Sequence, residues 1–521
     1  MFKFCIVESS RDINYQGFYL VPDNWDDWFE YEISYYLWIN DTEKECVGRV
    51  KIAEIDQRVR KTNLPDQFEA LEKNFVSVGF DEEYYEALKK TKFREQILES
   101  LNDIAFNLNI YERVQNDHVT KIALMREYSE SRLRGQINRM AMGGARLTDY
   151  NFTYIFPSVN PLTGENVKMQ FDVERNKKPA SNIHVMIGKN GVGKTSIIKK
   201  MIYALEKCVP TEEVGEVDTD WTTDFANIVF VSFSAFDEPI FEENFQIKFP
   251  IQYKFVGLVK NKSIKSRDTL TGEFVECSFS FYQNASKMRL WKDTIKVLEE
   301  SDNTFVEQGV DTWINESLKL EWLKEINKSQ QNGEDFGVET RLEMLKKEHT
   351  KHVFPLFSRL SSGHKIILLT VANLIDLVEE KTIVFLDEPE EHLHPPLVAA
   401  FIKALSNLLI YRNGVGIIAT HSPVIVQEVP RKCVWILTRA GEYLIPRRPD
   451  IETYGENLGE LTTEIFGYEV NNSGFHKELQ EAVKKSDSYE EARDIFHNQL
   501  GKEAKSILRA YMYDKEECVE E

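Results

Sequence analysis

A glycine-rich stretch around residue 190 constrains the fold more than any other part of this 521-residue chain. The apolar residues 183–187 lead into G-x-x-x-x-G-K-T at 188–195, and residues 196–200 continue with helical spacing. This order predicts a strand, a phosphate-binding loop and a helix. Glycines let successive N–H groups turn toward an anion, and a helix N-terminus adds partial positive charge there. The alternative, a chance match in a glycine-rich turn, is disfavoured by the strand before it and the helix after it.

The loop supplies candidate nucleotide-binding residues. Lys194 is long enough to reach the β- and γ-phosphates, and the Thr195 hydroxyl can ligate Mg²⁺. ATP and Mg²⁺ are therefore the expected ligands. The predicted contact set is Gly188, Lys189, Asn190, Gly191, Val192, Gly193, Lys194, Thr195 and Ser196.

Composition places the chain among ordinary globular proteins of several domains, with 42% apolar and 29% charged residues. No run of about 18 uncharged apolar residues predicts a membrane span. The first residues lack a signal-peptide layout. The six cysteines are scattered without a C-x-x-C pair, which is typical of a reducing cytoplasm and offers no zinc site. We therefore expect a cytoplasmic protein with no membrane partner.

The net charge of −21 argues against a broad nucleic-acid-binding surface. Simple solubility explains this charge, and a basic protein partner is equally compatible with it. Any nucleic-acid contact would have to be local. One local candidate is a helix face with Arg126, Arg132, Arg134 and Arg139, although such a face is more often solvated or salt-bridged. The other is a basic hairpin with Lys260, Lys262, Lys265 and Arg267, for which an ordinary exposed turn is an equally good explanation.

Periodicity divides the chain into three parts. Residues 1–145 predict an N-terminal α+β domain, with strands in 2–7, 17–21, 28–39 and 47–55 and helical spacing in 68–71, 83–88, 93–106 and 119–142. Residues 146–435 form the phosphate-loop domain, with strands in 150–156, 167–173, 228–233, 245–260 and 273–282, a disordered-looking acidic stretch at 211–220 and an inserted helical segment at about 285–357. Residues 436–521 predict a C-terminal helical region.

An apolar strand at 382–386 ends in two carboxylates, Asp387 and Glu388. A strand apolar on both faces is typical of the centre of a parallel sheet. Asp387 can hold Mg²⁺ through water beside Thr195, and Glu388 can polarise a water that attacks the γ-phosphate. Two adjacent acids at a buried strand end are costly as a purely structural feature.

Three further elements follow the same logic. Ser361 and Gly363, in L-S-S-G-H, open an apolar helix, and the N-terminus of that helix could bind an anion or Ser361 could simply cap it. Residues 390–394 follow the two carboxylates, and their two histidines are too few for a metal site. A second apolar strand, 414–419, places His421 at its end, where the ring could bond the γ-phosphate or the attacking water.

Together these motifs resemble the ABC-type ATPase head over about residues 147–435. The resemblance implies an α/β fold: an ABC-type P-loop head with an inserted helical subdomain. It makes residues 188–195 the Walker A motif, 360–364 the signature, Asp387 and Glu388 the Walker B pair, 390–394 the D-loop and His421 the switch histidine. The signature departs from the family at Ser362 and His364, which replace Gly and Gln. No Q-loop glutamine is evident; residues 234–237 occupy its expected place.

The family resemblance carries implications for partners. The signature of one protomer completes the phosphate site of another, so a head-to-tail homodimer is expected. The string D-E-P-E-E-H-L-H-P-P with T-H-S-P is similar to the overcoming-lysogenization-defect and RecF-like branch. No D-x-D nuclease motif follows His421.

The chain further resembles the ATPase of Septu anti-phage systems (PtuA), and some of these systems are retron-associated. The resemblance lies in the segments F-V-S-F-S-A-F-D, Y-G-E-N-L-G and G-F-H. That resemblance implies an HNH-type nuclease partner and, in retron versions, a reverse transcriptase carrying an RNA–DNA hybrid. A RecF-like repair ATPase acting directly on DNA is the alternative.

Overall fold

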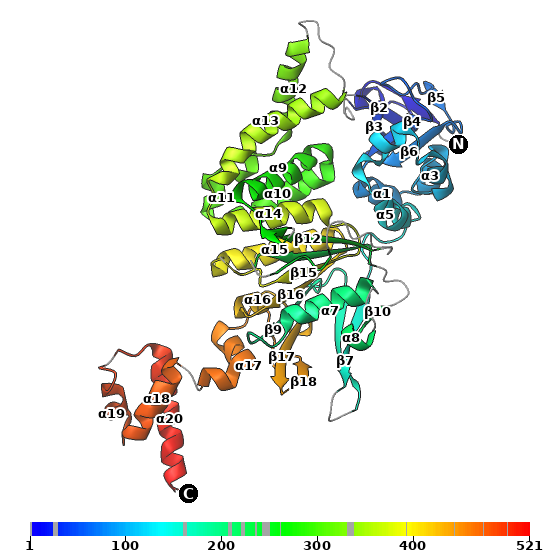
Figure 1. Ribbon diagram of the computed structural model, residues 1–521. Helices are drawn as coiled ribbons and strands as arrows, with labels where there is room; N and C mark the ends of the chain where they lie inside the picture. The colour runs from blue at the N-terminus through cyan, green and yellow to red at the C-terminus, as the bar shows by residue number, and fades with distance from the viewer. Residues whose placement is uncertain are drawn as a thin grey trace.

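The computed structural model describes residues 3–23, 30–159, 164–206, 211–219, 225–234, 237–241, 251–260, 262–330, 338–391, 393–441, 443–471, 474–497 and 499–520. A seven-stranded sheet within them occupies the middle of the molecule (Figure 1). Its order is β12 (Gln252–Gly257), β11 (Asn227–Ser232), β15 (Thr382–Asp387), β16 (Val415–Thr420), β9 (Ile183–Gly188), β17 (Val434–Ala440) and β18 (Tyr443–Arg447). Each described pairing is parallel except that of β17 with β18.

Apolar side chains cover both faces of this sheet, as the unbroken apolar runs predict. Along β15, Val384 and Leu386 pack toward one face and Ile383 and Phe385 toward the other. The first face is covered by α14 (Ser362–Leu377) and α15 (Pro395–Tyr411), and the second by α7 (Lys194–Glu206). A smaller sheet of β10 (Glu216–Thr219), β7 (Tyr150–Val159) and β8 (Asn166–Val173) shares the core beneath α7.

The helical insertion begins earlier than predicted. Residues 273–282 were expected to form a strand but lie mostly in α9 (Arg267–Ser280), which Ser266 caps. Their aromatic and β-branched content favours a strand, yet Phe274, Val275 and Phe279 recur at helical spacing and are buried together. The insertion continues through α10 (Ala285–Glu299), α11 (Asn303–Glu307), α12 (Glu316–Gln330) and α13 (Val338–Ser358).

Two local predictions, for the basic hairpin and for the acidic stretch, have different outcomes. The hairpin forms, from β13 (Val259–Lys260) and β14 (Ser263–Ile264), although Lys265 turns inward to Glu273 at 2.8 Å. The described part of the acidic stretch is ordered, contrary to expectation, as α8 (Thr211–Val214) and β10. Pairing of β10 with β7 supplies the backbone partners that its polar sequence does not predict.

The described residues up to 141 build a separate core around a sheet ordered β5 (Gln67–Phe68), β1 (Phe4–Ile6), β2 (Gly17–Pro22), β3 (Ser34–Asn40), β4 (Lys44–Glu54) and β6 (Phe75–Gly79). The helical prediction for 68–71 is wrong, because Phe68 pairs with Phe4 at the sheet edge. Helices α1 (Glu82–Lys89), α2 (Arg94–Ser100) and α3 (Leu108–Val114) follow.

The predicted basic helix at 119–142 is a broken series of short turns. It comprises α4 (His118–Ile122), a 3₁₀ turn (Leu124–Glu127), α5 (Glu130–Arg132), a π-helical turn (Leu133–Ile137) and α6 (Asn138–Ala141). Its arginines do not form one phosphate-binding face. Arg132 bonds buried Glu82, Arg139 bonds Glu380 and Arg134 bonds Glu130, which is the salt-bridged alternative.

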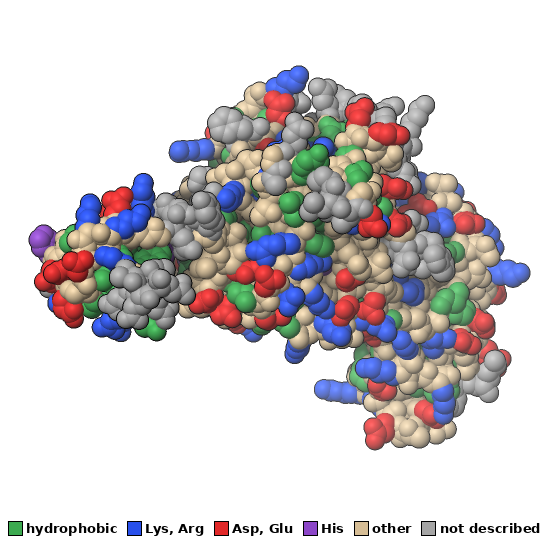
Figure 2. Space-filling model, turned by 90° about the horizontal axis from the view of Figure 1, so that it is seen from below, with side chains coloured by type: hydrophobic (Ala, Val, Ile, Leu, Met, Phe, Trp, Pro, Cys, Tyr) green, Lys and Arg blue, Asp and Glu red, His purple; other side chains and the backbone are tan. Residues whose placement is uncertain are grey.

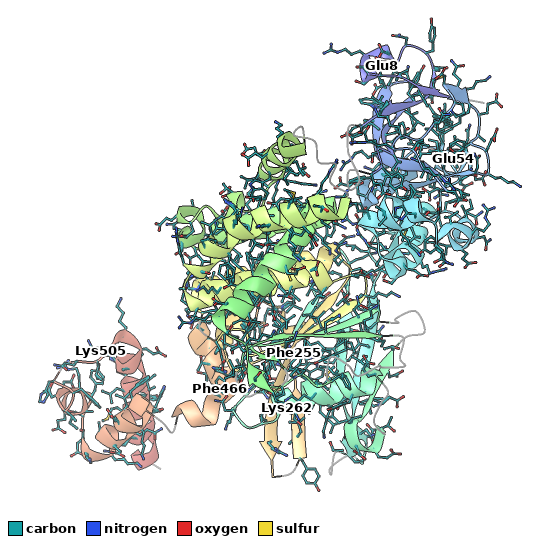
Figure 3. All side chains as sticks on the ribbon, turned by 45° about the horizontal axis from the view of Figure 1, so that its top comes forward. Glu8, Glu54, Phe255, Lys262, Phe466 and Lys505 are labelled. Carbon is teal, nitrogen blue, oxygen red and sulfur yellow. The ribbon has the colours of Figure 1, made fainter. Side chains whose placement is uncertain are left out.

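The stretch after residue 435 is not purely helical, because β17 and β18 extend the central sheet to Arg447. Helix α16 (Pro423–Gln427) precedes these strands, and α17 (Leu458–Asn471), α18 (Gly474–Lys485), α19 (Tyr489–Asp494) and α20 (Lys502–Glu520) follow them. The last three lie to one side of the molecule, where Lys505 marks them, while Glu8 and Glu54 mark the N-terminal domain (Figure 3). No helix in the described part of the chain is both long enough and apolar enough to span a membrane.

Candidate nucleotide site

The loop between β9 and α7 has the backbone shape that binds phosphate. Gly191 and Gly193 have φ angles of +79° and +105°, which side chains rarely adopt, and a Cβ at either position would meet open space. Val192 is buried beneath them. The Lys194 ammonium is also buried and donates to the carbonyl oxygens of Gly188 and Lys189 at 3.0 and 3.2 Å. Lys189, Asn190 and Ser196 are exposed around the loop.

Parallel pairing brings the carboxyl ends of β9, β15 and β16 to one edge of the sheet. Asp387 pairs with Ala419, and Thr420 pairs with Ile187. The side chains that follow these strands therefore meet. Glu388 Oε1 lies 3.7 Å from Lys194 Nζ and 3.5 Å from His421 Nδ1. Lys194, Glu388 and His421 thus form one cluster at the strand tips.

Asp387 is buried between this cluster and α7, with 6% of its surface exposed. Burial raises its pKa to about 6, although a hydrogen bond from the Thr195 hydroxyl opposes the rise. Its Oδ1 atom is buried and has no hydrogen-bond partner among the residues that the structure describes. An orphaned carboxylate oxygen beside a hydroxyl is the oxygen donor set that Mg²⁺ prefers, so Thr195 and Asp387 fit the ion.

The backbone of Glu388 is strained, with a φ of +45° that non-glycine residues seldom adopt. A hydrogen bond of 2.9 Å from its N–H to the Ala419 carbonyl holds this conformation. The turn swings the side chain back toward Lys194 and leaves it partly exposed. A carboxylate held this way can accept a proton from a water molecule that approaches from solvent.

A second carboxylate, whose role we did not predict from the sequence, fixes the histidine. Glu390 accepts hydrogen bonds from the Thr420 hydroxyl and from the His421 N–H, the latter at 3.1 Å. Its Oε1 also lies 3.4 Å from His421 Nδ1. His421 therefore faces two carboxylates, Glu388 and Glu390. The sequence signal for this role was the position of Glu390 two residues beyond the Walker B pair.

The signature residues lie on another side of the sheet. Ser361 caps α14 and Gly363 is buried in its first turn. This helix covers one face of the sheet and α7, which follows the phosphate loop, covers the other. Ser361 instead contacts His364, whose Nε2 lies 3.0 Å from Asp302. The chain thus gathers the Walker residues and His421 in one place, and Ser361 and Gly363 in a second.

The place expected for a Q-loop holds a polar contact instead. Asp237 accepts from the Ser232 hydroxyl at 2.7 Å and lies 3.3 Å from Lys199 on α7. Residues 235 and 236 of that stretch and His392 of the predicted D-loop lie outside the described residues. Within the described residues, no cluster of three or more His, Cys, Asp or Glu side chains could hold a metal ion by itself.

Comparison with known proteins agrees with an ATPase fold. Residues 323–427 match the family described as "AAA domain, putative AbiEii toxin, Type IV TA system". The chain is 35% identical over 537 residues to "Protein ea59" of Escherichia phage lambda, covering 99% of each chain. A solved structure, "An inward-facing conformation of a putative metal-chelate type ABC transporter", is 12% identical, with a TM-score of 0.29 over 61% of this chain and 90% of that one. The family match, together with the phosphate loop between β9 and α7, shows a P-loop ATPase fold of the AAA type.

Proposed function

This chain belongs to the same family as protein ea59 of Escherichia phage lambda, and from that premise we propose that it is an ABC-type ATPase that controls a separate nuclease in anti-phage defence. The observation that carries the ATPase part is the convergence of Lys194, Glu388 and His421 at one sheet edge, with 3.7 and 3.5 Å between their polar atoms.

The chemistry of hydrolysis follows from the placement of the side chains. Lys194 neutralises charge on the β- and γ-phosphates, and the N–H groups of the phosphate loop donate to their oxygens. Thr195 and Asp387 would hold Mg²⁺, which would neutralise further phosphate charge there. Glu388 accepts the proton of the attacking water. His421 is held in place by Glu390 and donates a hydrogen bond to the γ-phosphate or orients the water.

Two copies of the chain form the working unit in this proposal. Support comes from the separation of the phosphate loop from Ser361, whose helix covers the opposite face of the sheet. A signature that cannot complete its own chain's site can complete that of a second copy, head to tail. ATP bound between the copies then links nucleotide state to assembly, as a ligand stabilises whichever state binds it better.

Control of a separate nuclease is the part of the proposal that goes furthest beyond ATP binding and hydrolysis. It is supported by the match to the family whose description names the AbiEii toxin and a type IV toxin–antitoxin system. It is also supported by the Septu-like motifs. An HNH-type nuclease is the proposed partner, with a reverse transcriptase carrying an RNA–DNA hybrid in a retron-associated version. Pull-down from cells that express the native gene neighbours tests this, and recovery of the ATPase alone would contradict it.

A RecF-like ATPase acting directly on DNA is the second candidate. It is favoured because the D-E-P-E-E-H-L-H-P-P string of this chain is similar to that of the RecF-like branch. The charge of −21 weighs against it, and the face seen in Figure 2 mixes acidic with basic side chains. DNA-stimulated hydrolysis would favour this candidate over the first.

Replacement of Glu388 tests the ATPase assignment. Glu388→Gln keeps the side-chain shape but cannot accept the proton, so turnover should fall about 100- to 10,000-fold while ATP binding persists. The trapped ATP should make the dimer accumulate on size-exclusion chromatography. The matched control is Glu460→Gln, an exposed position on α17. Turnover at the wild-type rate in Glu388→Gln would overturn the assignment.

A further inference from the structure

Asp302 joins three segments of the chain at one carboxylate. It lies between α10 and α11 in the helical insertion, where Oδ1 accepts from the Thr304 N–H at 2.8 Å and so caps α11. Its Oδ2 lies 3.0 Å from His364 Nε2 and 3.2 Å from His394 Nε2. His364 belongs to the signature turn, and His394 caps α15 at the end of the predicted D-loop.

The hydrogen-bond directions follow from the chemistry of the groups. A carboxylate oxygen only accepts, so Nε2 of each ring carries the donated proton. Nδ1 of His394 then accepts from the Leu397 N–H at 3.4 Å. Nδ1 of His364 is hydrogen-bonded to the Ser361 hydroxyl, with 2.6 Å between the atoms. A continuous chain of bonds therefore runs from Asp302 through His364 to Ser361.

The cluster is enclosed enough for these bonds to matter. Asp302 and His364 are 10% and 13% exposed at the side chain, and the Phe305 ring packs edge-on against His364 at 4.9 Å between centroids. Burial raises the pKa of Asp302, but hydrogen bonds from Thr304, His394 and His364 outweigh it and hold the pKa well below the usual range. Asp302 is therefore a charged anchor shielded from most of the solvent.

We propose that Asp302 is a positioning residue that locks the signature turn to the start of α15, so that Ser361 and His394 meet the second copy's ATP as parts of one rigid surface. The proposal rests on the head-to-tail function proposed above. Asp302 touches no nucleotide itself and acts through His364 and His394. Misplacement of a group by about 1 Å can cost on the order of 100-fold in rate, which is why such a lock affects turnover.

Two substitutions remove the carboxylate without removing the helix cap. Asp302→Asn keeps the shape and the oxygen that caps α11, and Asp302→Ser substitutes a strong capping residue. Either should raise the ATP concentration needed for dimerisation about 10- to 100-fold and lower turnover to a similar extent. Binding of ATP to the monomer, measured with a fluorescent ATP analogue, should stay within about 2-fold, because Lys194 is untouched. Asp268→Asn, exposed on the first turn of α9, is the control.

Two further measurements separate a lock from a general structural effect. In a His364→Ala/His394→Ala background, Asp302→Asn should have no additional effect, because its partners are already gone. Dimerisation is read in the Glu388→Gln background, where hydrolysis does not intervene. If Glu388→Gln dimerises and Asp302→Asn and Asp302→Ser behave like Asp268→Asn, this inference is overturned and the proposed function survives. If Glu388→Gln neither dimerises nor loses turnover, the proposed function itself fails.

Discussion

The N-terminal domain and the C-terminal helices flank the ATPase head in opposite ways. The N-terminal domain contacts the head through a buried charged group. Within the domain, Glu82 and Arg132 are at most 3% exposed and form an ion pair. From the head, Tyr411 of α15 donates a hydrogen bond to Glu82 at 3.2 Å. Helices α18, α19 and α20 pack mainly on one another around their own small core of Leu479, Val483, Ala492, Leu508 and Met512. The N-terminal domain therefore shares buried contacts with the head, whereas the C-terminal helices form a module with a core of their own.

The points of contact explain why this difference bears on function. Ser129 and Ser131 both donate to Glu379 at 2.6 Å, and Arg139 bonds Glu380. These two glutamates lie just before β15, the strand that ends in Asp387. The helix α15, which begins after the D-loop, ends at the tyrosine that contacts Glu82. The N-terminal domain therefore contacts the residues just before β15 and the C-terminal end of α15.

The largest effect should come from breaking the buried pair. Glu82→Gln leaves the Arg132 guanidinium buried without its counter-charge, which typically costs about 3–5 kcal/mol. Urea unfolding should show that loss. Glu83→Gln is the matched control, because Glu83 pairs with Arg289 at the surface, where both side chains are about half exposed and the pair contributes under about 1 kcal/mol. Equal losses in the two variants would contradict the larger contribution assigned to the buried pair.

Acid should weaken the same interface. Burial raises the pKa of Glu82, but Arg132, Arg412 and Arg146 outweigh it and lower the pKa from 4.5 to about 2. A depressed folded-state pKa means that the stabilisation is present above about pH 4.5 and is lost as the pH falls toward 2. Thermal melting from pH 5 to 3 should show a steep decline in wild type and a shallower one in Glu82→Gln. Parallel curves would count against this source of acid sensitivity.

Glu380 tests whether the N-terminal domain supports catalysis as well as folding. Glu380→Gln weakens its charged bond to Arg139 and should cost about 1.5–3 kcal/mol in urea unfolding, because hydrogen bonds to charged groups are worth about that much. Glu380 is 6% exposed and lies just before the strand that ends in Asp387, so turnover should also fall a few-fold. Glu343→Gln, exposed on α13, is the control and should change neither quantity. Lost stability with unchanged turnover would confine the domain to a structural role.

The proximity of the side chains at the carboxyl ends of β15 and β16 was predictable from the sequence because of how parallel sheets are built. Asp387, Glu388 and His421 directly follow apolar strands, and parallel strands end at one edge, so proximity followed from order alone. Asp302 follows no such rule. It precedes His364 by 62 residues and His394 by 92, and only the packing of the insertion brings them together. Tertiary packing also explains why α9 was not predicted. Its composition favours a strand, but its apolar residues recur at helical spacing and pack together in the core.

The smallest effect on the head should come from damaging the C-terminal module. Leu508→Ala empties a fully buried position in α20, and large-to-small changes of this kind cost about 2–5 kcal/mol locally. Hydrogen exchange should then accelerate in α18, α19 and α20, since they share this core, while ATP turnover stays within about 2-fold of wild type. Ser506→Ala, exposed on the same helix, should change neither quantity. A parallel loss of turnover in Leu508→Ala would show that the module is coupled to the nucleotide site, and the contrast between the two flanks would then be one of packing alone.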